Sequence, residues 1–179
     1  MKKLWVSAVL AAGLALPVQA QEAADSVAPE MASGVSDKQM VTAQDFMVVA
    51  ANPYASQAGF DVLKAGGNAI DAMVAVQLVL GLVEPQSSGI GGGAFLVYYD
   101  AEAGKLTTFD GRETAPEAAT PELFQDANGE PLRFYDAVVG GLSVGTPGTV
   151  RLLYDTHTKL GSLPWEDLVA PASSWQQRL

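Results

Sequence analysis

The stretch from Ile70 to Val83 restricts the fold most, because its residues are apolar on nearly every side of a helix. Asn68 stands before it as a favoured N-cap, and Asp71 takes the third helical position, where a carboxylate suits the positive end of the helix dipole. A helix without a polar face must be buried on most sides. Fourteen helical residues measure about 21 Å, which is too short to cross a bilayer. The sequence therefore predicts a buried core helix.

A strand and a second helix are predicted before this core helix. Residues 46–51 form a continuous apolar run of the kind found in buried strands. Asn52 and Pro53 are favoured at the N-cap and first position of a helix, and Gly66 is favoured just past its end. The residues that share one face at helical spacing are Ala55, Ala58, Gly59, Val62 and Leu63.

An antiparallel hairpin and further helices are predicted after the core helix. The strands are 95–99 and 106–110, joined by a turn at 100–104. Further elements are a short strand at 142–144, a helix that Thr146-Pro147 opens and Gly161 ends, and a short helix from Leu163. This order indicates an α+β fold rather than alternating βαβ units.

The first 44 residues are expected to lie outside the folded domain. Lys2 and Lys3 precede an apolar stretch of about 13 residues, and Ala20 supplies a small residue before a cleavage site, which is typical of a secretory signal. Residues 21–44 carry few large apolar side chains and are expected to be a flexible lead-in. The chain is therefore predicted to be exported, periplasmic or secreted, with no membrane anchor after cleavage.

Charge and composition exclude several function classes. The net charge is −10, from 10 basic and 20 acidic residues, so a nucleic-acid partner is not expected. The chain has no cysteine and a single histidine, His157, so no thiolate or histidine-rich metal centre is expected. We interpret His157 as a surface histidine, because no placed serine and acid accompany it.

The glycine-rich run from Gly89 to Ala94 imitates a dinucleotide fingerprint, with Asp110 about twenty residues further on. That fingerprint must follow a strand and open a helix, because the helix N-terminus holds the pyrophosphate. Here a helix precedes the run and a strand follows it. Close approach of two backbones is the favoured interpretation, and a loop lining a ligand pocket stays open as an alternative.

Three charged residues, Asp110, Arg112 and Glu113, stand at a predicted strand end in a chain that is poor in charge. A guanidinium there suits bidentate binding of a carboxylate. The alternative is a local ion pair of Arg112 with Asp110 or Glu113. Motifs for a nucleophile elbow, a zincin or a Walker A loop do not occur in the sequence.

Several ordered blocks resemble the gamma-glutamyltransferase (glutathione hydrolase) family, in the N-terminal part of its large subunit. They cover about residues 45–172, and the combination is more specific than any one block. The blocks are Asn52–Leu63, Gly66–Ala72, Val83–Pro85, Ser88–Gly93, Asp110–Pro116, Ser143–Thr149 and Gly161–Trp165.

The resemblance implies an exported proenzyme of the N-terminal-nucleophile hydrolase class with an αββα sandwich, incomplete in this chain. The family cleaves itself into two subunits, and the new N-terminal threonine of the small subunit attacks the γ-glutamyl amide of glutathione. Water or an amino acid then takes the γ-glutamyl group, without a metal or other cofactor. Arg112 matches the arginine that holds the α-carboxylate, and Asp110 and Glu113 are given a supporting role.

The departures from the family pattern set further expectations. The family's nucleophilic threonine and small subunit have no match in this sequence, so the catalytic nucleophile is expected elsewhere and the chain alone is expected to be inactive. Residues 173–179 are expected to be a divergent tail after a partial domain at 45–172. Alternatives are a non-catalytic exported domain that binds glutamate or glutathione, or part of a related acylase.

Overall fold

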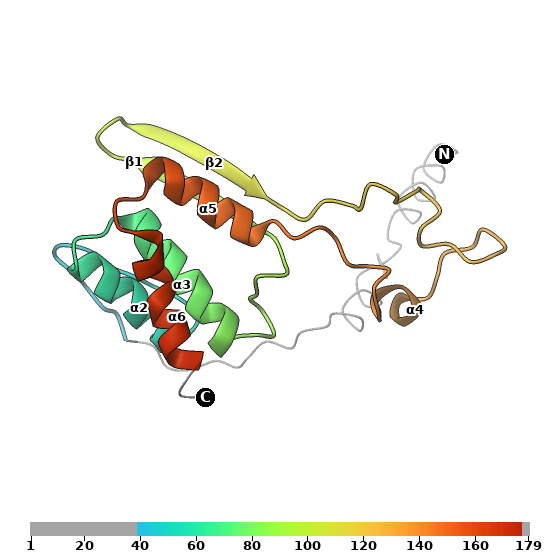
Figure 1. Ribbon diagram of the computed structural model, residues 1–179, viewed down its shortest axis with the longest axis horizontal. Coiled ribbons are helices and arrows are strands. Elements are labelled where there is room, and N and C mark those ends of the chain that lie inside the picture. Colours follow the sequence, from blue (N-terminus) through green and yellow to red (C-terminus); the bar gives the residue numbers. More distant parts are fainter. Residues whose placement is uncertain (1–38, 177–179) are drawn as a thin grey trace, which may run out of the picture. The chain divides into compact units, whose positions relative to one another are not determined.

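The computed structural model describes residues 39–176 (Figure 1). The chain divides between Thr42 and Ala43, and the helices and strands of the described residues lie in the second part. In chain order these elements are α2 (Pro53–Lys64), α3 (Ala69–Val83), β1 (Ala94–Asp100), β2 (Lys105–Gly111), α4 (Phe134–Val138), α5 (Thr149–Leu160) and α6 (Trp165–Gln176). The predicted signal 1–20, most of the lead-in and the end of the predicted tail fall on residues 1–38 and 177–179, outside the described residues.

Helix α2 begins and ends as its sequence predicts. The Asn52 side chain accepts a hydrogen bond from the Tyr54 N–H at 3.0 Å, and Pro53 occupies the first turn. Gly66 has a φ of +95°, the left-handed conformation that a residue with a side chain rarely adopts. The N–H of Gly67 returns to the Val62 carbonyl at 3.0 Å, which closes the helix end.

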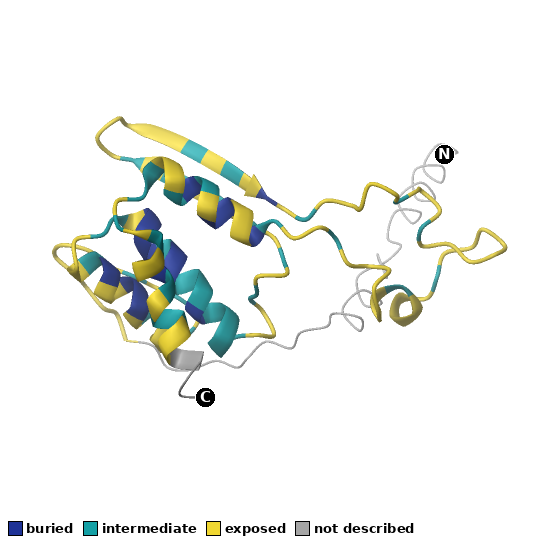
Figure 2. Cartoon of the chain, viewed as in Figure 1, coloured by how far each residue is buried: buried dark blue, intermediate teal, exposed yellow. Residues whose placement is uncertain are grey.

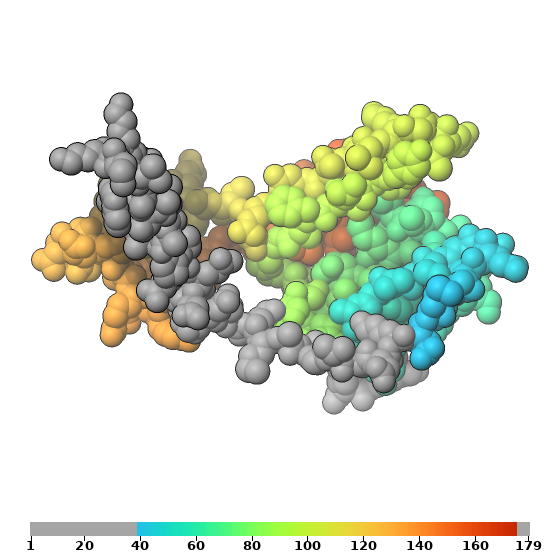
Figure 3. All heavy atoms as spheres, turned by 180° about the vertical axis from the view of Figure 1, so that it is seen from behind, coloured from blue at the N-terminus to red at the C-terminus, as the bar shows by residue number. Residues whose placement is uncertain are grey.

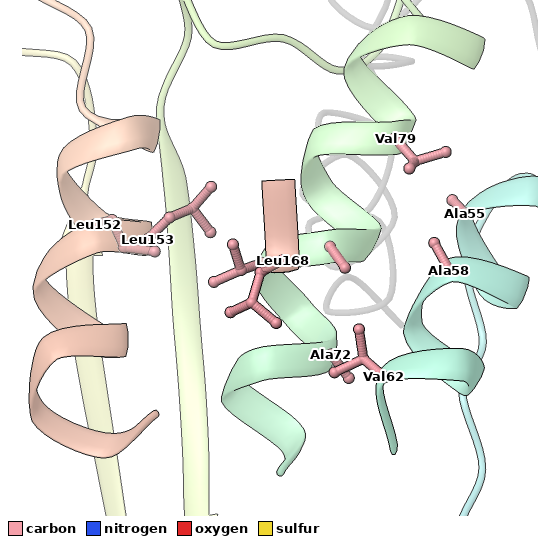
Figure 4. Packing of buried hydrophobic residues seen from close by; sticks show 10 residues of the cluster. Ala55, Ala58, Val62, Ala72, Val79, Leu152, Leu153 and Leu168 are labelled. Atoms are coloured by element: carbon pink, nitrogen blue, oxygen red, sulfur yellow. The ribbon is translucent and has the colours of Figure 1, made fainter. Parts of the chain in front are cut away.

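Helix α3 is the centre of the core. It packs against α2, α5 and α6, and among its residues Ala69 alone is exposed (Figure 2). Figure 4 shows side chains of α2 pointing toward α3, with Leu168 of α6 and Leu153 of α5 on the opposite side. The prediction of a helix buried on most sides is confirmed. The buried apolar cluster comprises Ala55, Ala58, Val62, Ala72, Val74, Ala75, Val79, Leu152, Leu153 and Leu168.

Strands β1 and β2 form the predicted antiparallel hairpin, in register from Ala94 opposite Gly111 to Asp100 opposite Lys105. Because successive side chains alternate between faces, Leu96 and Phe109 of one face pack against the buried cluster. The other face of the hairpin is open. Its apolar residues, which we call the open face, are Phe95, Val97, Tyr99 and Leu106, each between 62% and 67% exposed.

The prediction of a buried strand at 46–51 is wrong. These residues adopt no regular structure, and Val49 is 82% exposed; Figure 3 shows the beginning of the described chain in cyan at the surface. A strand requires a neighbour for its N–H and C=O groups. The sheet of the described residues contains β1 and β2 alone, and the Ala50 N–H donates instead to the Ser56 hydroxyl at 3.0 Å.

Two predictions near the start of α5 are also wrong. Residues 142–144 form a turn rather than a strand. The helix begins at Thr149 with Gly148 as its N-cap, not at Thr146. Thr146 is held in an extended conformation by two backbone hydrogen bonds with Thr114, so its side chain is not placed to cap a helix. The predicted end of this helix at Gly161 is confirmed.

Helix α6 begins where predicted and is longer than the short helix expected, since it reaches Gln176 and contains Pro171. Within residues 39–176 no helix is long and apolar enough to cross a membrane.

Candidate functional site

The predicted site residues lie where β2 leaves the sheet. Gly111 ends β2 and is buried against α5, because a side-chain carbon at this position would lie 2.6 Å from Leu152 Cβ. Only a glycine allows the helix to approach the strand this closely. Arg112 and Glu113 follow directly, so the packing of α5 on β2 fixes the place where their backbone emerges.

Asp110 shapes the backbone at this point and does not pair with the guanidinium. Its Oδ1 accepts a hydrogen bond from the Arg112 N–H at 2.9 Å. A side chain that bonds the backbone two residues on stabilises a turn. This hydrogen bond fixes the direction of the chain as it leaves β2, and the supporting role of Asp110 in binding stays a prediction.

The Arg112 side chain is 71% exposed, and its Nη1 lies 3.6 Å from Glu113 Oε2. This is the local ion pair considered from the sequence, although the distance is too long for a hydrogen bond. Arg112 borders two hollows. One, of about 470 Å³, lies between β2 and α5, and the other, of about 280 Å³, lies beside residues 142–145.

The larger hollow also contains two other cations, which have partners of their own. Arg151 Nε donates to Asp155 at 2.7 Å, and this hydrogen bond raises the pKa of Arg151. Lys159 Nζ lies 5.8 Å from the centre of the Phe109 ring. Of the two guanidinium groups in this hollow, Arg112 is the one whose carboxylate partner lies beyond hydrogen-bond distance, at 3.6 Å.

Glu113 lies deeper than Arg112. Its Oε2 is buried and accepts no hydrogen bond from the described residues. It borders a hollow of about 350 Å³ together with Gln77, Ser88 and Gly93. A buried carboxylate oxygen without a hydrogen bond is costly, and the cation nearest to this one, Arg112 Nη1, lies 3.6 Å away.

The glycine-rich run joins α3 to β1, with a helix before it and a strand after it. This order contradicts a dinucleotide fingerprint. The Gly92 carbonyl accepts hydrogen bonds from the N–H groups of Gly148 and Thr149, at 3.0 and 3.1 Å. A side-chain carbon on Gly93 would lie 2.8 Å from the Glu113 nitrogen. The close-approach interpretation is confirmed.

The surface assignment of His157 is wrong. Its side chain is 14% exposed, its Nε2 lies 2.9 Å from the Leu163 carbonyl, and its ring contacts Trp165 edge-on. Gly161 makes this possible, because a side chain there would collide with the imidazole. The sequence shows a histidine near a glycine but not that the ring folds back over it.

Sequence reasoning also missed the wider role of Asp71. Its carboxylate is fully buried, and it accepts hydrogen bonds from the Asn68 N–H and from both the N–H and the hydroxyl of Ser162. Ser162 lies 91 positions away in the sequence, so no local pattern indicates this contact.

Within residues 39–176 no cluster of three or more histidine, cysteine or acidic residues is placed to hold a metal.

Comparison with known proteins decides the family. The sequence model of the family described as gamma-glutamyltranspeptidase matches residues 55–178. The chain belongs to the gamma-glutamyltranspeptidase family. The glutathione hydrolase proenzyme of Bacillus subtilis strain 168 is 46% identical over 135 residues, which are 75% of this chain and 23% of the relative.

Solved structures agree with this assignment. The gamma-glutamyltranspeptidase of Pseudomonas nitroreducens, solved with L-DON, superposes with a TM-score of 0.70 at 36% identity, over 75% of this chain and 39% of its own. The cephalosporin acylase of Bacillus halodurans gives the same TM-score and identity over 84% of this chain and 27% of its own. The predicted fold class is confirmed as an incomplete α+β fold of the N-terminal-nucleophile hydrolase type. The chain spans less than a quarter of the Bacillus subtilis relative.

Proposed function

We propose that this chain is the carboxylate-binding part of a gamma-glutamyltransferase, an enzyme that cleaves the γ-glutamyl amide of glutathione and related compounds. Water or an amino acid would take the γ-glutamyl group. One observation carries the proposal: Arg112 follows the point where β2 packs closely on α5, and most of its side chain is exposed. The names of the relatives give the reaction class.

In this proposal each site residue has a distinct task. The guanidinium of Arg112 binds the substrate α-carboxylate through two parallel hydrogen bonds, a geometry that lysine lacks. Asp110 fixes the turn from which Arg112 departs, and Glu113 supports the guanidinium from its buried side. The nucleophile and the remaining binding groups come from the small-subunit portion of a complete enzyme, so we expect no hydrolysis by the 179 residues alone. No metal or other cofactor is needed.

We also propose the domain organisation and export predicted from the sequence. Residues 1–20 are the secretory signal, 21–44 the lead-in, 45–172 the partial large-subunit domain and 173–179 the tail. The mature protein would begin at Gln21 in the periplasm or outside the cell. Sequencing the N-terminus of exported protein tests this, because a start at Met1 would contradict a cleaved signal.

The reaction is tested by a graft enzyme. We define it as the Bacillus subtilis relative in which the matched 135-residue region is replaced by the corresponding residues of this chain. The expected result is self-cleavage and release of p-nitroaniline from γ-glutamyl-p-nitroanilide. A graft enzyme that cleaves itself but does not release p-nitroaniline would contradict the proposal.

Two other functions can be distinguished from γ-glutamyl transfer by experiment. The likeness to a cephalosporin acylase favours a second candidate, an acylase for other amides, which would hydrolyse amides that lack an α-carboxylate equally well. A non-catalytic domain would instead bind glutamate or glutathione on its own. Titration calorimetry of the purified chain with glutamate measures that binding directly.

A further inference from the structure

The buried oxygen of Glu113 requires a counterpart. The Glu113 side chain as a whole is 31% exposed, but its Oε2 is buried and has no hydrogen-bond donor among the described residues, which is unfavourable for a charged oxygen. The cation recorded beside it is Arg112 Nη1, at 3.6 Å. The pair is therefore asymmetric, with the carboxylate oxygen of Glu113 buried and the side chain of Arg112 mostly exposed.

Glycines from two separate loops make room for this carboxylate. A side-chain carbon on Gly93 would lie 2.8 Å from both Cδ and the backbone nitrogen of Glu113. One on Gly145 would lie 2.9 Å from Glu113 Cβ, and one on Gly92 would lie 3.6 Å from Oε1. Real side-chain carbons do not approach other atoms closer than about 3.0 Å, so any larger residue at Gly93 or Gly145 would displace Glu113.

The same loops are attached to the core. Gly92 accepts the first N–H groups of α5, and Thr146, next to Gly145, pairs with Thr114, next to Glu113. Glu113 thus lies between two backbone segments, one hydrogen-bonded to the beginning of α5 and the other to Thr114. An ion pair anchored in this way can orient the otherwise exposed guanidinium of Arg112.

We propose that Glu113 is a positioning residue for Arg112. Gly93, which has no side chain, leaves the space that the Glu113 carboxylate occupies. This inference rests on the proposed function and deepens it, because it names what orients the carboxylate-binding group. Glu113 does not touch the substrate in this account. It restricts the directions that the guanidinium can take, so that both hydrogen bonds to a carboxylate form together.

Kinetics of the graft enzyme provide the first test. Glu113→Gln and Gly93→Ala should each raise the KM for γ-glutamyl-p-nitroanilide roughly tenfold, the order seen when the outer partner of a ligand-binding group is lost. The kcat and the self-cleavage should stay close to the parent values, because the nucleophile is untouched. Glu117→Gln and Gly91→Ala are matched controls, since Glu117 is exposed and a side chain on Gly91 meets no atom within 4 Å. A parental KM in the Glu113→Gln variant would overturn the proposal.

Urea unfolding of the full 179-residue chain provides a second test that needs no activity. Arg112→Ala should lower the midpoint when Glu113 is present, because it leaves the buried oxygen unpaired. The same substitution should have no further effect in the Glu113→Gln background. Equal shifts in the two backgrounds would overturn the pairing. A graft enzyme that cleaves itself but does not hydrolyse γ-glutamyl-p-nitroanilide would refute the proposed function and not the role of Glu113. The unfolding midpoints of the parent, the two single variants and the double variant would still decide that role.

Discussion

At the residue scale, Asp71 is the one charged side chain that is buried among the described residues. Its carboxylate accepts the Asn68 N–H at 2.9 Å and the Ser162 N–H at 3.0 Å, and the Ser162 hydroxyl donates to it at 2.5 Å. His157 Nε2 lies 3.6 Å from it. The carboxylate therefore joins the beginning of α3 to the connection between α5 and α6.

Replacing Asp71 should destabilise the chain markedly. Asp71→Asn keeps the size of the side chain but places an amide against donors that then lack an acceptor. Hydrogen bonds to a charged group contribute about 1.5–3 kcal/mol, and unsatisfied donors add to the loss. We expect the free energy of unfolding in urea to fall by at least that amount. The exposed Asp45→Asn is the matched control, and an equal effect of both substitutions would contradict this assignment.

The stability of the chain should also depend on pH through Asp71. Burial alone would raise the pKa of this carboxyl, but hydrogen bonds from Ser162 and Asn68 outweigh burial and hold the pKa below its ordinary value of 3.8. A lowered pKa in the folded state means that the contribution is complete above about pH 5 and is lost as the pH falls through 3.8 toward the folded-state pKa. Unfolding free energies between pH 7 and pH 2 should therefore fall less steeply in Asp71→Asn than in the parent chain. Parallel curves would refute the assignment.

At the element scale, the two ends of α3 connect the core to the site. Its first turn is closed by a reciprocal cap, in which Asn68 accepts the N–H groups of Ile70 and Asp71. The Asn68 amide also donates to the Leu160 carbonyl at the end of α5, at 2.7 Å. Its last turn leads into the glycine-rich run that holds Glu113. A disturbance of the cap should therefore loosen α5 as well as α3.

Substitutions of Asn68 should separate these two roles. Asn68→Ser keeps the capping oxygen and loses the bond to Leu160, whereas Asn68→Ala loses both. Loss of a cap costs about 1 kcal/mol and loss of a neutral hydrogen bond a similar amount. We expect the unfolding free energy to fall by about 1 kcal/mol in the serine variant and about 2 kcal/mol in the alanine variant, measured in urea. Equal values in the two variants would mean that the capping oxygen contributes nothing, and a serine variant as stable as the parent would mean that the link to α5 contributes nothing.

Most helix ends, apart from the start of α5, could be predicted from the sequence because their signals are local. Asn52-Pro53, Asn68 with Asp71, and the glycines at 66 and 161 each act within a few residues of the helix end that they mark. The hairpin could be predicted for the same reason, since a short turn joins its strands. The strand predicted at 46–51 depends on a partner elsewhere in the chain, and apolar composition does not report whether that partner is present.

The site was less predictable than the fold. Arg112 follows from the resemblance of its block to a known family, not from spacing or charge alone. The burial of Glu113 depends on Gly93 and Gly145, which are distant from it in the sequence, and the buried network of Asp71 depends on Ser162. Contacts of this kind are set by packing, so a single sequence does not reveal them.

At the scale of the whole molecule, the open face of the hairpin is an apolar sheet surface that no described residue covers. Phe95, Val97 and Tyr99 alternate along β1 and are all more than 60% exposed, with Leu106 opposite Tyr99 on β2. Exposed apolar strands with free edges favour association with other chains. We infer that in a complete enzyme this face is covered by the portion that the chain lacks relative to its relatives.

The isolated chain should therefore self-associate. Sedimentation of the purified chain should show oligomers whose fraction rises with concentration, despite the net charge of −10. Val97→Lys and Tyr99→Lys should shift the distribution toward monomer without lowering the unfolding midpoint, because neither side chain belongs to the buried cluster. A monodisperse monomer of the unsubstituted chain would show that the open face needs no cover.

The central claim is that Arg112 holds the substrate α-carboxylate, and one substrate-and-variant comparison tests it directly. The graft enzyme and its Arg112→Ala and Arg112→Lys variants are given γ-glutamyl-p-nitroanilide and 4-aminobutyryl-p-nitroanilide, which lacks the α-carboxylate; the exposed Arg133→Lys is the control. In a complete enzyme we expect this site to be closed to bulk water, where loss of a buried charged partner costs roughly 2–5 kcal/mol, or about 30-fold to several-thousand-fold. We predict that loss in kcat/KM for the γ-glutamyl substrate in both Arg112 variants and no change for the 4-aminobutyryl substrate. Equal losses on the two substrates, or none on either, would contradict the claim.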